Sequence, residues 1–322
     1  MKAVLCKAFG PPSALVVGEA PPPRPGKGEV LIRVEAAAVN FPDTLIIQGR
    51  YQAKPAFPFA PGGEVAGRLE ALGEGVKGPA PGTRELAMSG HGGFAELACA
   101  PDENVVVLPD TIDAVTAAAL SYAYGTVLHA LRDRAALRPG ETVLVLGAGG
   151  GAGMAAVQIA LLMGAQVIAA ASPPKHAACL AAGAAAVVDY TAENWRDRLK
   201  AQAPAGIDVV FDAVGGPYAE PALRSIAWGG RYLVVGFAAG DIPRIPLNLA
   251  LLKGCGILGV LYGTHVKREP EANRALMAQI FGWIVAGALR PAIAQVWPLD
   301  RAAEALDLLL ARQVTGKIVL TT

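Results

Sequence analysis

The residues with the clearest chemical potential are glycines that follow a short apolar run. Val143–Leu146 precedes the spacing Ala148-x-Gly150-x-x-Gly153. Glycine permits a tight turn and lets a phosphate approach without a Cβ in the way. Where such a turn opens a helix, free N–H groups and the positive end of the helix dipole face the anion. The spacing therefore predicts a pyrophosphate site. The residues expected to contact it are Ala148, Gly150, Gly151, Ala152 and Gly153.

The segments around the glycines favour a dinucleotide as the ligand. Residues 154–162 have a helical composition, and Gln166–Ala171 form a second apolar strand. Strand, glycine turn, helix and strand together make the unit that binds the pyrophosphate in dinucleotide-binding folds. A tight strand–helix turn without a ligand is the alternative.

The residues after the second strand indicate which dinucleotide binds. In folds that prefer NAD, an acid about twenty residues beyond the glycines holds the ribose hydroxyls. Here Ala171 and Ser172 occupy that place, and Lys175 is the next charged residue. A hydroxyl and an ammonium suit a 2′-phosphate, which an acid would repel. NADPH is therefore expected, with Ser172 and Lys175 as contacts, although Lys175 could be only a solvated helix residue. Tyr190 is expected beside the adenine ribose or in ordinary surface packing.

The chain changes character along its length. With 322 residues it has room for about two domains. The first third is rich in Gly, Pro and short strand-like runs, whereas strands and helices alternate from about Ser121 onward. Six strands with crossovers predict an α/β domain with a doubly wound parallel Rossmann sheet over residues 123–263. Helices are expected between these strands over residues 173–182, 191–200 and 217–227. The remaining tail is too short for its own domain. It is expected to complete an irregular β-rich domain of residues 1–122 and 264–322.

Composition excludes several function classes. The net charge is +1, and no basic stripe indicates a nucleic-acid partner. Thr142–Pro174 carries no charge, but its glycines interrupt any single membrane-spanning helix. The N-terminus lacks the apolar core of a signal peptide. The four cysteines are far apart and none has CxxC spacing, so neither a zinc site nor a disulfide framework is indicated. No membrane association and a cytoplasmic location are expected.

With these elements in place, the chain resembles the medium-chain dehydrogenase/reductase superfamily, and within it the zinc-free NADPH:quinone oxidoreductases that include zeta-crystallin. The resemblance runs from end to end and implies a GroES-like fold for the β-rich catalytic domain. Its most specific pieces are Val39–Asp43, Gln48–Tyr51, Pro61–Gly67, Phe211–Gly216 and Gly316–Leu320.

The same resemblance indicates that a metal is missing. In the zinc alcohol dehydrogenases of this superfamily, a cysteine would fall near Asn40, and a histidine would stand in the motif that reads Gly62-Gly63-Glu64 here. Catalytic zinc keeps three protein ligands. Two of them are replaced here by residues that do not bind zinc, and no nearby cluster of cysteine and histidine takes their place, so no metal is expected. Alcohol oxidation needs an electrophile to stabilise the alkoxide. Without one, the accessible reaction is hydride delivery to an electron-poor acceptor. The histidines expected to be structural or exposed are His91, His129, His176 and His265.

The resemblance also supplies candidate site residues. It implies that Asn40 lies near the nicotinamide ribose and that Tyr51 points its hydroxyl into the substrate space. A phenol with a pKa of about 10 stays protonated at neutral pH and can donate to an oxyanion. A packing role for Tyr51 is the alternative, and Asp43 is expected to cap or orient the loop. Other cofactor contacts, each with a packing or solvation alternative, are expected at Thr126, Val214, Gly236, Phe237 and Lys317.

The strand expected at Cys255–Leu261 lies at an edge of the sheet, where an apolar strand invites pairing. In relatives the matching strand pairs with its copy, so a homodimer with a continuous twelve-strand sheet is expected. The expected function is NADPH-dependent reduction of quinones by hydride or single-electron transfer. One alternative is reduction of α,β-unsaturated carbonyls, such as enones, enals or enoyl thioesters. The other is NADPH binding with little turnover.

Overall fold

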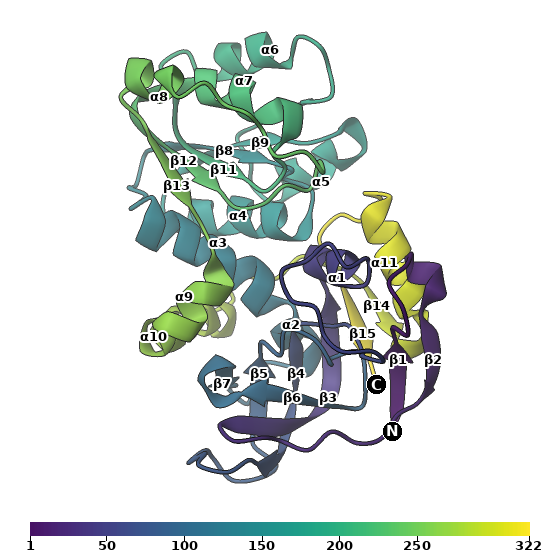
Figure 1. Cartoon of the computed structure of the whole chain (residues 1–322). Helices are drawn as coiled ribbons and strands as arrows, with labels where there is room; N and C mark the ends of the chain where they lie inside the picture. The colour runs from purple at the N-terminus through teal and green to yellow at the C-terminus, as the bar shows by residue number, and fades with distance from the viewer. The chain divides into compact units, whose positions relative to one another are not determined.

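A computed structural model describes residues 1–322, and the chain divides into two compact units (Figure 1). The first unit contains residues 1–122 and 263–322, and the second contains residues 123–262. The C-terminal segment belongs to the first unit because its last strand pairs with a long strand near the N-terminus, with Ile318 opposite Val39.

The second unit is built on a six-stranded sheet with the order β10-β9-β8-β11-β12-β13 (Figure 1). Every neighbouring pair is parallel, which confirms the doubly wound sheet predicted from the alternating segments. The chain order reverses at β8, and ligands bind at such switch points in open parallel sheets. The strands are β8 (Thr142–Leu146), β9 (Gln166–Ala170), β10 (Ala186–Val188), β11 (Ile207–Asp212), β12 (Ile226–Val234) and β13 (Gly256–Gly259).

Helices connect these strands and bury the apolar faces of the sheet. The uncharged stretch Thr142–Pro174 is divided between β8, a helix and β9, and none of the helices in the structure has the length and apolar character needed to cross a membrane. Two π-helical segments, η3 and η4, flank a short helix at the start of the unit. These elements are η3 (Leu120–Gly125), α3 (Thr126–Leu128), η4 (His129–Arg134), α4 (Gly151–Leu162), η5 (Pro173–Lys175), α5 (His176–Ala181), α6 (Trp195–Gln202), η6 (Gly216–Tyr218), α7 (Ala219–Arg224) and α8 (Asn248–Lys253).

Some predicted boundaries in this unit were wrong. Within the helix expected over residues 173–182, Pro173–Lys175 form the 3-10 helix η5, and α5 spans only His176–Ala181. The helix expected from residue 191 begins at Trp195, because the Asp189 carboxylate accepts from Thr191 in a turn. The strand expected over residues 255–261 spans only β13, since a new helix begins at Tyr262.

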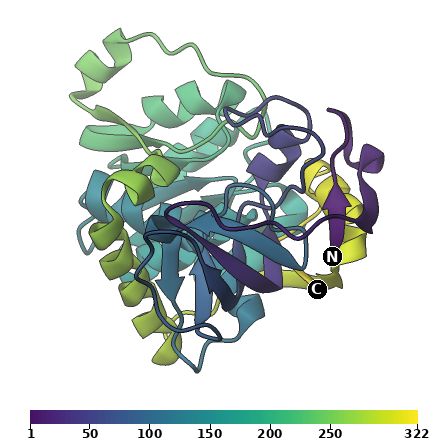
Figure 2. The same ribbon diagram turned by 60° about the horizontal axis from the view of Figure 1, so that its bottom comes forward.

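The first unit is built on a seven-stranded, mostly antiparallel sheet with the order β14-β15-β3-β4-β5-β7, to which β6 adds by pairing with β3. β1 and β2 form a separate hairpin, and both chain termini lie side by side in this unit (Figures 1 and 2). The strands are β1 (Lys2–Leu5), β2 (Val16–Glu19), β3 (Glu29–Val39), β4 (Val65–Leu72), β5 (Arg84–Ala87), β6 (Leu97–Pro101), β7 (Val105–Val107), β14 (Ile293–Pro298) and β15 (Lys317–Thr321).

The core of the first unit lies between this sheet and helices from both ends of the chain. Apolar residues of β3, such as Ile32, pack with Ile46 of α1 and Leu306 of α11. This arrangement holds the segment after β3 and the start of β15 side by side, which matters for the site below. The helices of the unit are α1 (Phe41–Ile46), α2 (Ala114–Ala118), α9 (Tyr262–Arg268), α10 (Pro270–Val285) and α11 (Ala302–Leu310).

Candidate active site

The glycine turn of the second unit lies at the carboxyl end of β8 and opens α4. The N–H of Gly150 donates to the carbonyl of Gly147 at 3.0 Å, which closes the turn. A Cβ at Gly153 would lie 2.1 Å from that same carbonyl oxygen, so only glycine lets α4 begin this close to the strand. No side chain caps the helix, and the N–H groups of its first turn have no acceptor within it. The turn can therefore receive an anion.

The lysine predicted to select NADPH lies against this turn. A Cβ at Gly149 would lie 2.4 Å from Cδ of Lys175, so the aliphatic part of the lysine covers the glycine backbone. Lys175 is half-buried rather than fully solvated. Ser172, at the end of β9, has a hydroxyl without a hydrogen-bond partner in the chain. The two polar groups expected at a 2′-phosphate therefore belong to the same edge of the sheet as the turn.

The segments after β10 and β11 reach the same edge. Val214 packs over the glycine turn, because its Cγ2 lies 2.7 Å from the Cβ position of Gly147. Tyr190 packs edge-on against Tyr218, with ring centroids 4.6 Å apart. The structure thus places Tyr190 beside the loop that carries Val214.

A buried carboxylate shapes that loop. Asp212 Oδ1 accepts from the N–H groups of Val214 and Gly215, each at 2.8 Å, and its Oδ2 accepts from the Tyr232 hydroxyl at 2.6 Å. Burial raises the pKa of Asp212, while these three donors lower it. The hydrogen bonds fix the loop after β11 to the strand that precedes it.

Several backbone groups expected to bind the nicotinamide carboxamide are already used within the protein. The Val214 N–H donates to Asp212, and the Val214 carbonyl accepts from Ala239. The Gly236 N–H donates to the Asp212 carbonyl. The groups that remain without an intrachain partner are the Gly236 carbonyl and the Phe237 N–H. These two groups are therefore available for a hydrogen bond to a ligand.

Thr126 begins α3, which packs against α4, and its hydroxyl has no partner in the chain. Next to it, Tyr124 donates from its hydroxyl to Gln158 of α4 at 2.7 Å. This hydrogen bond ties the π-helical segment η3 to the helix that opens at the glycine turn.

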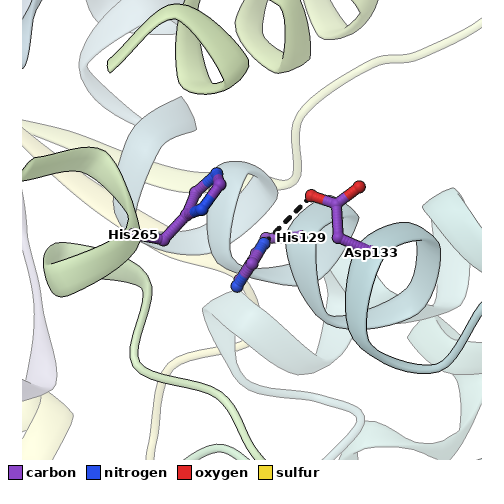
Figure 3. Close-up of side chains that lie close together, drawn as sticks. All are labelled: His129, Asp133 and His265. Atoms are coloured by element: carbon purple, nitrogen blue, oxygen red, sulfur yellow. Dashed lines mark hydrogen bonds and ion pairs between the residues drawn. The ribbon is translucent and has the colours of Figure 1, made fainter. Parts of the chain in front are cut away.

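His129 has a structural role in the same segment. Its Nδ1 lies 3.0 Å from Oδ2 of Asp133, one helical turn away (Figure 3). Burial opposes ionisation of Asp133, but hydrogen bonds from His129 and Arg132 outweigh it and lower its pKa to about 2. His176 hydrogen-bonds to the Ala171 carbonyl, and His91 is exposed. His265, also drawn in Figure 3, is a half-buried residue of α9 in the first unit.

In the first unit, the candidate site is a buried polar network around Asn40, the residue between β3 and α1. The Asn40 amide donates from Nδ2 to the Ala38 carbonyl at 3.3 Å and to Glu64 Oε2 at 3.0 Å. Lys317, the first residue of β15, donates from Nζ to Asn40 Oδ1 and lies 3.4 Å from Glu64 Oε2. Lys317 is only 4 % exposed, so the alternative of a solvated charge was wrong. Asn40 is thereby held in one orientation.

Glu64 is the acidic centre of this network and has no exposed surface. Its Oε1 accepts from the N–H of Tyr122 at 3.0 Å, while Oε2 faces Asn40 and Lys317. Burial raises the pKa of Glu64, and Lys317 is the largest influence in the opposite direction. The carboxylate therefore depends on the ammonium for its charge balance.

Asp43 orients the loop, as expected from its place in the motif. Its Oδ2 accepts from the Asn40 N–H at 2.7 Å, and its Oδ1 accepts from the N–H groups of Gly62 and Gly63. Burial raises the pKa of Asp43 to about 7, although these N–H groups and Lys317 lower it. Asp43 thus joins Asn40 to the glycine pair before β4.

Tyr51 is half-buried against the core of the first unit, and its hydroxyl has no partner in the chain. Burial, and then the charge of Asp43, raises the pKa of Tyr51 above its ordinary value. The phenol is therefore a neutral donor at physiological pH.

Sequence reasoning missed Tyr122, which belongs to the same group. Its hydroxyl would lie 2.5 Å from a Cβ at Gly63. Burial first, and then Asp43, Tyr51 and Glu64, raise the pKa of Tyr122 well above its ordinary value. No local motif surrounds this tyrosine. The only signal was the glycine pair Gly62–Gly63, whose significance depends on a residue distant in the sequence.

Two family models and several full-length relatives match this chain. A family model described as alcohol dehydrogenase GroES-like domain matches residues 26–110, and one described as zinc-binding dehydrogenase matches residues 182–320. The quinone oxidoreductase-like protein 2 homolog of Nematostella vectensis is 37 % identical over 325 residues, covering 100 % of this chain and 89 % of that protein. The quinone oxidoreductase of Sus scrofa is 36 % identical over 327 residues, covering 99 % and 97 %.

Solved structures of oxidoreductases are also similar to this chain over its full length. Mycobacterial Rv1454c complexed with NADPH superposes with a TM-score of 0.93 at 30 % identity, covering 100 % of both chains. The quinone oxidoreductase of Escherichia coli complexed with NADPH superposes with a TM-score of 0.92 at 27 % identity, again covering 100 % of both chains.

A parallel Rossmann sheet inserted into a GroES-like β unit defines a medium-chain dehydrogenase/reductase. The relatives that match over the full length of the chain identify a family within this superfamily. The chain belongs to the quinone oxidoreductase family of that superfamily, and it is an oxidoreductase.

Proposed function

We propose that this protein reduces quinones with NADPH and without a metal ion. The observation that carries the proposal is Lys175 lying across Gly149, beside a glycine turn whose N–H groups are open to an anion. No carboxylate follows β9 at the place where an NAD-preferring fold would carry one. The solved relatives with NADPH support the same cofactor.

The residues of the polar network argue against a metal at this site. Asn40 and Gly63 stand where the resemblance would place a cysteine and a histidine ligand. Both hydrogens of the Asn40 amide are donated, and its oxygen accepts from the Lys317 ammonium. A divalent cation at Asn40 would have to displace or repel that positive charge.

Bound NADPH would supply a hydride to the acceptor. In this proposal the first turn of α4 holds the pyrophosphate, Ser172 and Lys175 hold the 2′-phosphate, and Tyr190 packs beside the adenosine. The Gly236 carbonyl and the Phe237 N–H orient the carboxamide, with Thr126 nearby on α3. Asn40 contributes at the nicotinamide ribose, and Lys317 acts through Asn40. Tyr51 donates a hydrogen bond to the acceptor oxygen that gains negative charge.

Tyr51 would serve a quinone and an α,β-unsaturated carbonyl equally well. The names of the relatives favour quinones. The test is NADPH oxidation measured by absorbance with a panel of quinones and enones. If none of them oxidises NADPH above background while NADPH raises the melting temperature, the protein is a binder with little turnover. The same samples, analysed for metal, should contain far less than one zinc per chain, and chelators should leave the rate unchanged.

We also propose that the protein is a homodimer joined through β13. This strand pairs only with β12 and lies at an edge of the sheet. Large apolar side chains around it are exposed, including Leu261 at 63 % and Trp228 at 81 %. Sedimentation should give twice the chain mass, and Leu261→Asp should shift it toward the monomer. A reducing cytoplasm remains our proposal for the location, supported by four free cysteines.

A further inference from the structure

We propose that the Tyr122 hydroxyl is a second hydrogen-bond donor to the acceptor oxygen, and that the phenols of Tyr122 and Tyr51 together replace the electrophile that a metal would provide. This inference rests on the proposed reduction of a quinone or enone. It adds a catalytic residue that neither the motifs nor the resemblance indicates.

The first argument is the position of the phenol. The Tyr122 N–H donates to Glu64 Oε1, which anchors the residue beside the start of β4. Its hydroxyl oxygen and Cζ would lie 2.5 Å and 3.1 Å from a Cβ at Gly63. Tyr122 therefore fills the space that a side chain at position 63 would need. This is the position at which the resemblance would place a zinc-ligating histidine.

The second argument is the state of the hydroxyl. Tyr122 is half-buried, and no hydrogen bond within the chain uses its hydroxyl. The groups that most affect its ionisation, after burial, are Asp43, Tyr51 and Glu64, which are all neutral or negative. A phenolate beside them is disfavoured, so the group remains a donor with its proton available to a ligand. Tyr51 is in the same condition, with a free hydroxyl and Asp43 nearby.

The third argument is the chemistry that a metal-free site requires. The acceptor gains a hydride, which is one proton with two electrons, and NADPH becomes NADP+; one negative charge is left on the former carbonyl oxygen. A proton from a phenol or from the solvent then neutralises this oxygen, and a solvent proton restores the phenol. Preorganised donors aimed at such an oxygen each contribute roughly a hundredfold to a thousandfold in rate. Two phenols can therefore supply much of what one cation would.

The direct test is Tyr122→Phe, which keeps the ring and removes only the hydroxyl. The turnover number with a quinone should fall by about a hundredfold, whereas the Kd of NADPH and the melting temperature should stay the same. An unchanged turnover number would overturn the inference. If none of the quinones and enones supports NADPH oxidation by the unmodified protein, the proposed function itself fails. This outcome is distinct from failure of the inference about Tyr122.

A binding measurement separates a catalytic role from a merely structural one. The anion 4-nitrophenolate presents a partly charged phenolate oxygen, as the reduced acceptor does, and its absorbance reports its ionisation. It should bind the unmodified protein and bind Tyr122→Phe about tenfold more weakly or worse, as expected for loss of a charge-assisted hydrogen bond. Tyr124→Phe is the matched control, since its hydroxyl already donates to Gln158. Equal affinity for the unmodified protein and Tyr122→Phe, or no binding to either, would contradict the inference.

Gly63→Ala provides an independent route to the same hydroxyl. The added methyl group would meet the Tyr122 oxygen at 2.5 Å and push it aside, so activity should fall nearly as far as in Tyr122→Phe. In the Tyr122→Phe background, the same alanine should cost little more, because the displaced hydroxyl is already gone. If the fold-decrease in turnover number of the double variant equals the product of the two single decreases, Gly63 and Tyr122 do not act through the same hydroxyl.

Discussion

The ammonium of Lys317 donates a hydrogen bond to the side-chain oxygen of Asn40, although the two residues lie 277 positions apart in the sequence. Because the amide oxygen faces the ammonium, the amide nitrogen must face Glu64 and the Ala38 carbonyl. One lysine therefore both neutralises Glu64 and fixes which end of Asn40 is a donor.

Lys317→Met should destabilise the protein strongly, because it leaves the Glu64 carboxylate buried without a countercharge. Removal of one partner of a buried ion pair costs about 3–5 kcal/mol, measured as the free energy of unfolding in urea. Glu64→Gln should restore much of the loss in the double variant. Lys267→Met, at an exposed position, is the control. A change below about 1 kcal/mol for Lys317→Met, which is within the range of a surface ion pair, would contradict the buried network.

Lys175→Ala should weaken the binding of NADPH by about tenfold or more, because it removes a charged donor from the 2′-phosphate. NADH lacks that phosphate, so its affinity should change little. The measurement is fluorescence titration with both dinucleotides. Lys200→Ala removes an exposed lysine from α6 and should affect neither. Equal weakening of both dinucleotides would remove the role assigned to Lys175.

Tyr51→Phe should lower the turnover number by about a hundredfold and leave NADPH binding intact. Because burial and Asp43 raise the pKa of Tyr51, the residue should cause no loss of activity through deprotonation between neutral pH and its ordinary pKa of about 10. A pH–rate profile with each protein tests both statements. If the variant turns over at the rate of the unmodified protein, Tyr51 is a packing residue.

Glu85 should make stability depend on pH, away from the site. It is 1 % exposed, Oε2 has no partner, and burial followed by Asp102 raises its pKa from 4.5 to about 7. Since the folded protein holds this proton more tightly than the unfolded chain, the free energy of unfolding should fall as the pH rises between these values. Glu85→Gln should remove this fall and stabilise the protein at pH 8 by about 3 kcal/mol.

Urea unfolding across this pH range measures the effect. The exposed variant Glu103→Gln should retain the slope of the unmodified protein. A Glu85→Gln protein with the same slope would mean that Glu85 is already ionised in the folded state at low pH.

The parts of the fold that could be predicted are those that depend on the pattern of neighbouring residues in the sequence. The apolar run Val143–Leu146 and the glycines after it specify a strand and a turn within a few residues of each other. Lys317–Thr321 reads as a strand because four of its five residues are β-branched, aliphatic or both. Boundaries were less certain, since the turn that delays α6 depends on one hydrogen-bonded aspartate, Asp189.

The parts of the site that were not predicted depend on contacts between distant segments. The relation between Glu64 and Tyr122 spans 58 positions, and that between Glu64 and Lys317 spans 253. From sequence alone, a lysine is expected to be exposed to solvent, and a tyrosine outside any motif is expected to have a packing role. Only the pairing of β15 with β3 shows that Lys317 is buried beside Asn40.

The same pairing has a consequence for biosynthesis. Glu64 emerges from the ribosome 253 residues before Lys317, the cation that neutralises it. Until that lysine is translated, the carboxylate must stay hydrated or take up a proton. The start of β4 therefore cannot pack as it does in the native structure. Co-translational folding of the catalytic unit should therefore stall at this point and finish only after the Rossmann unit has been synthesised.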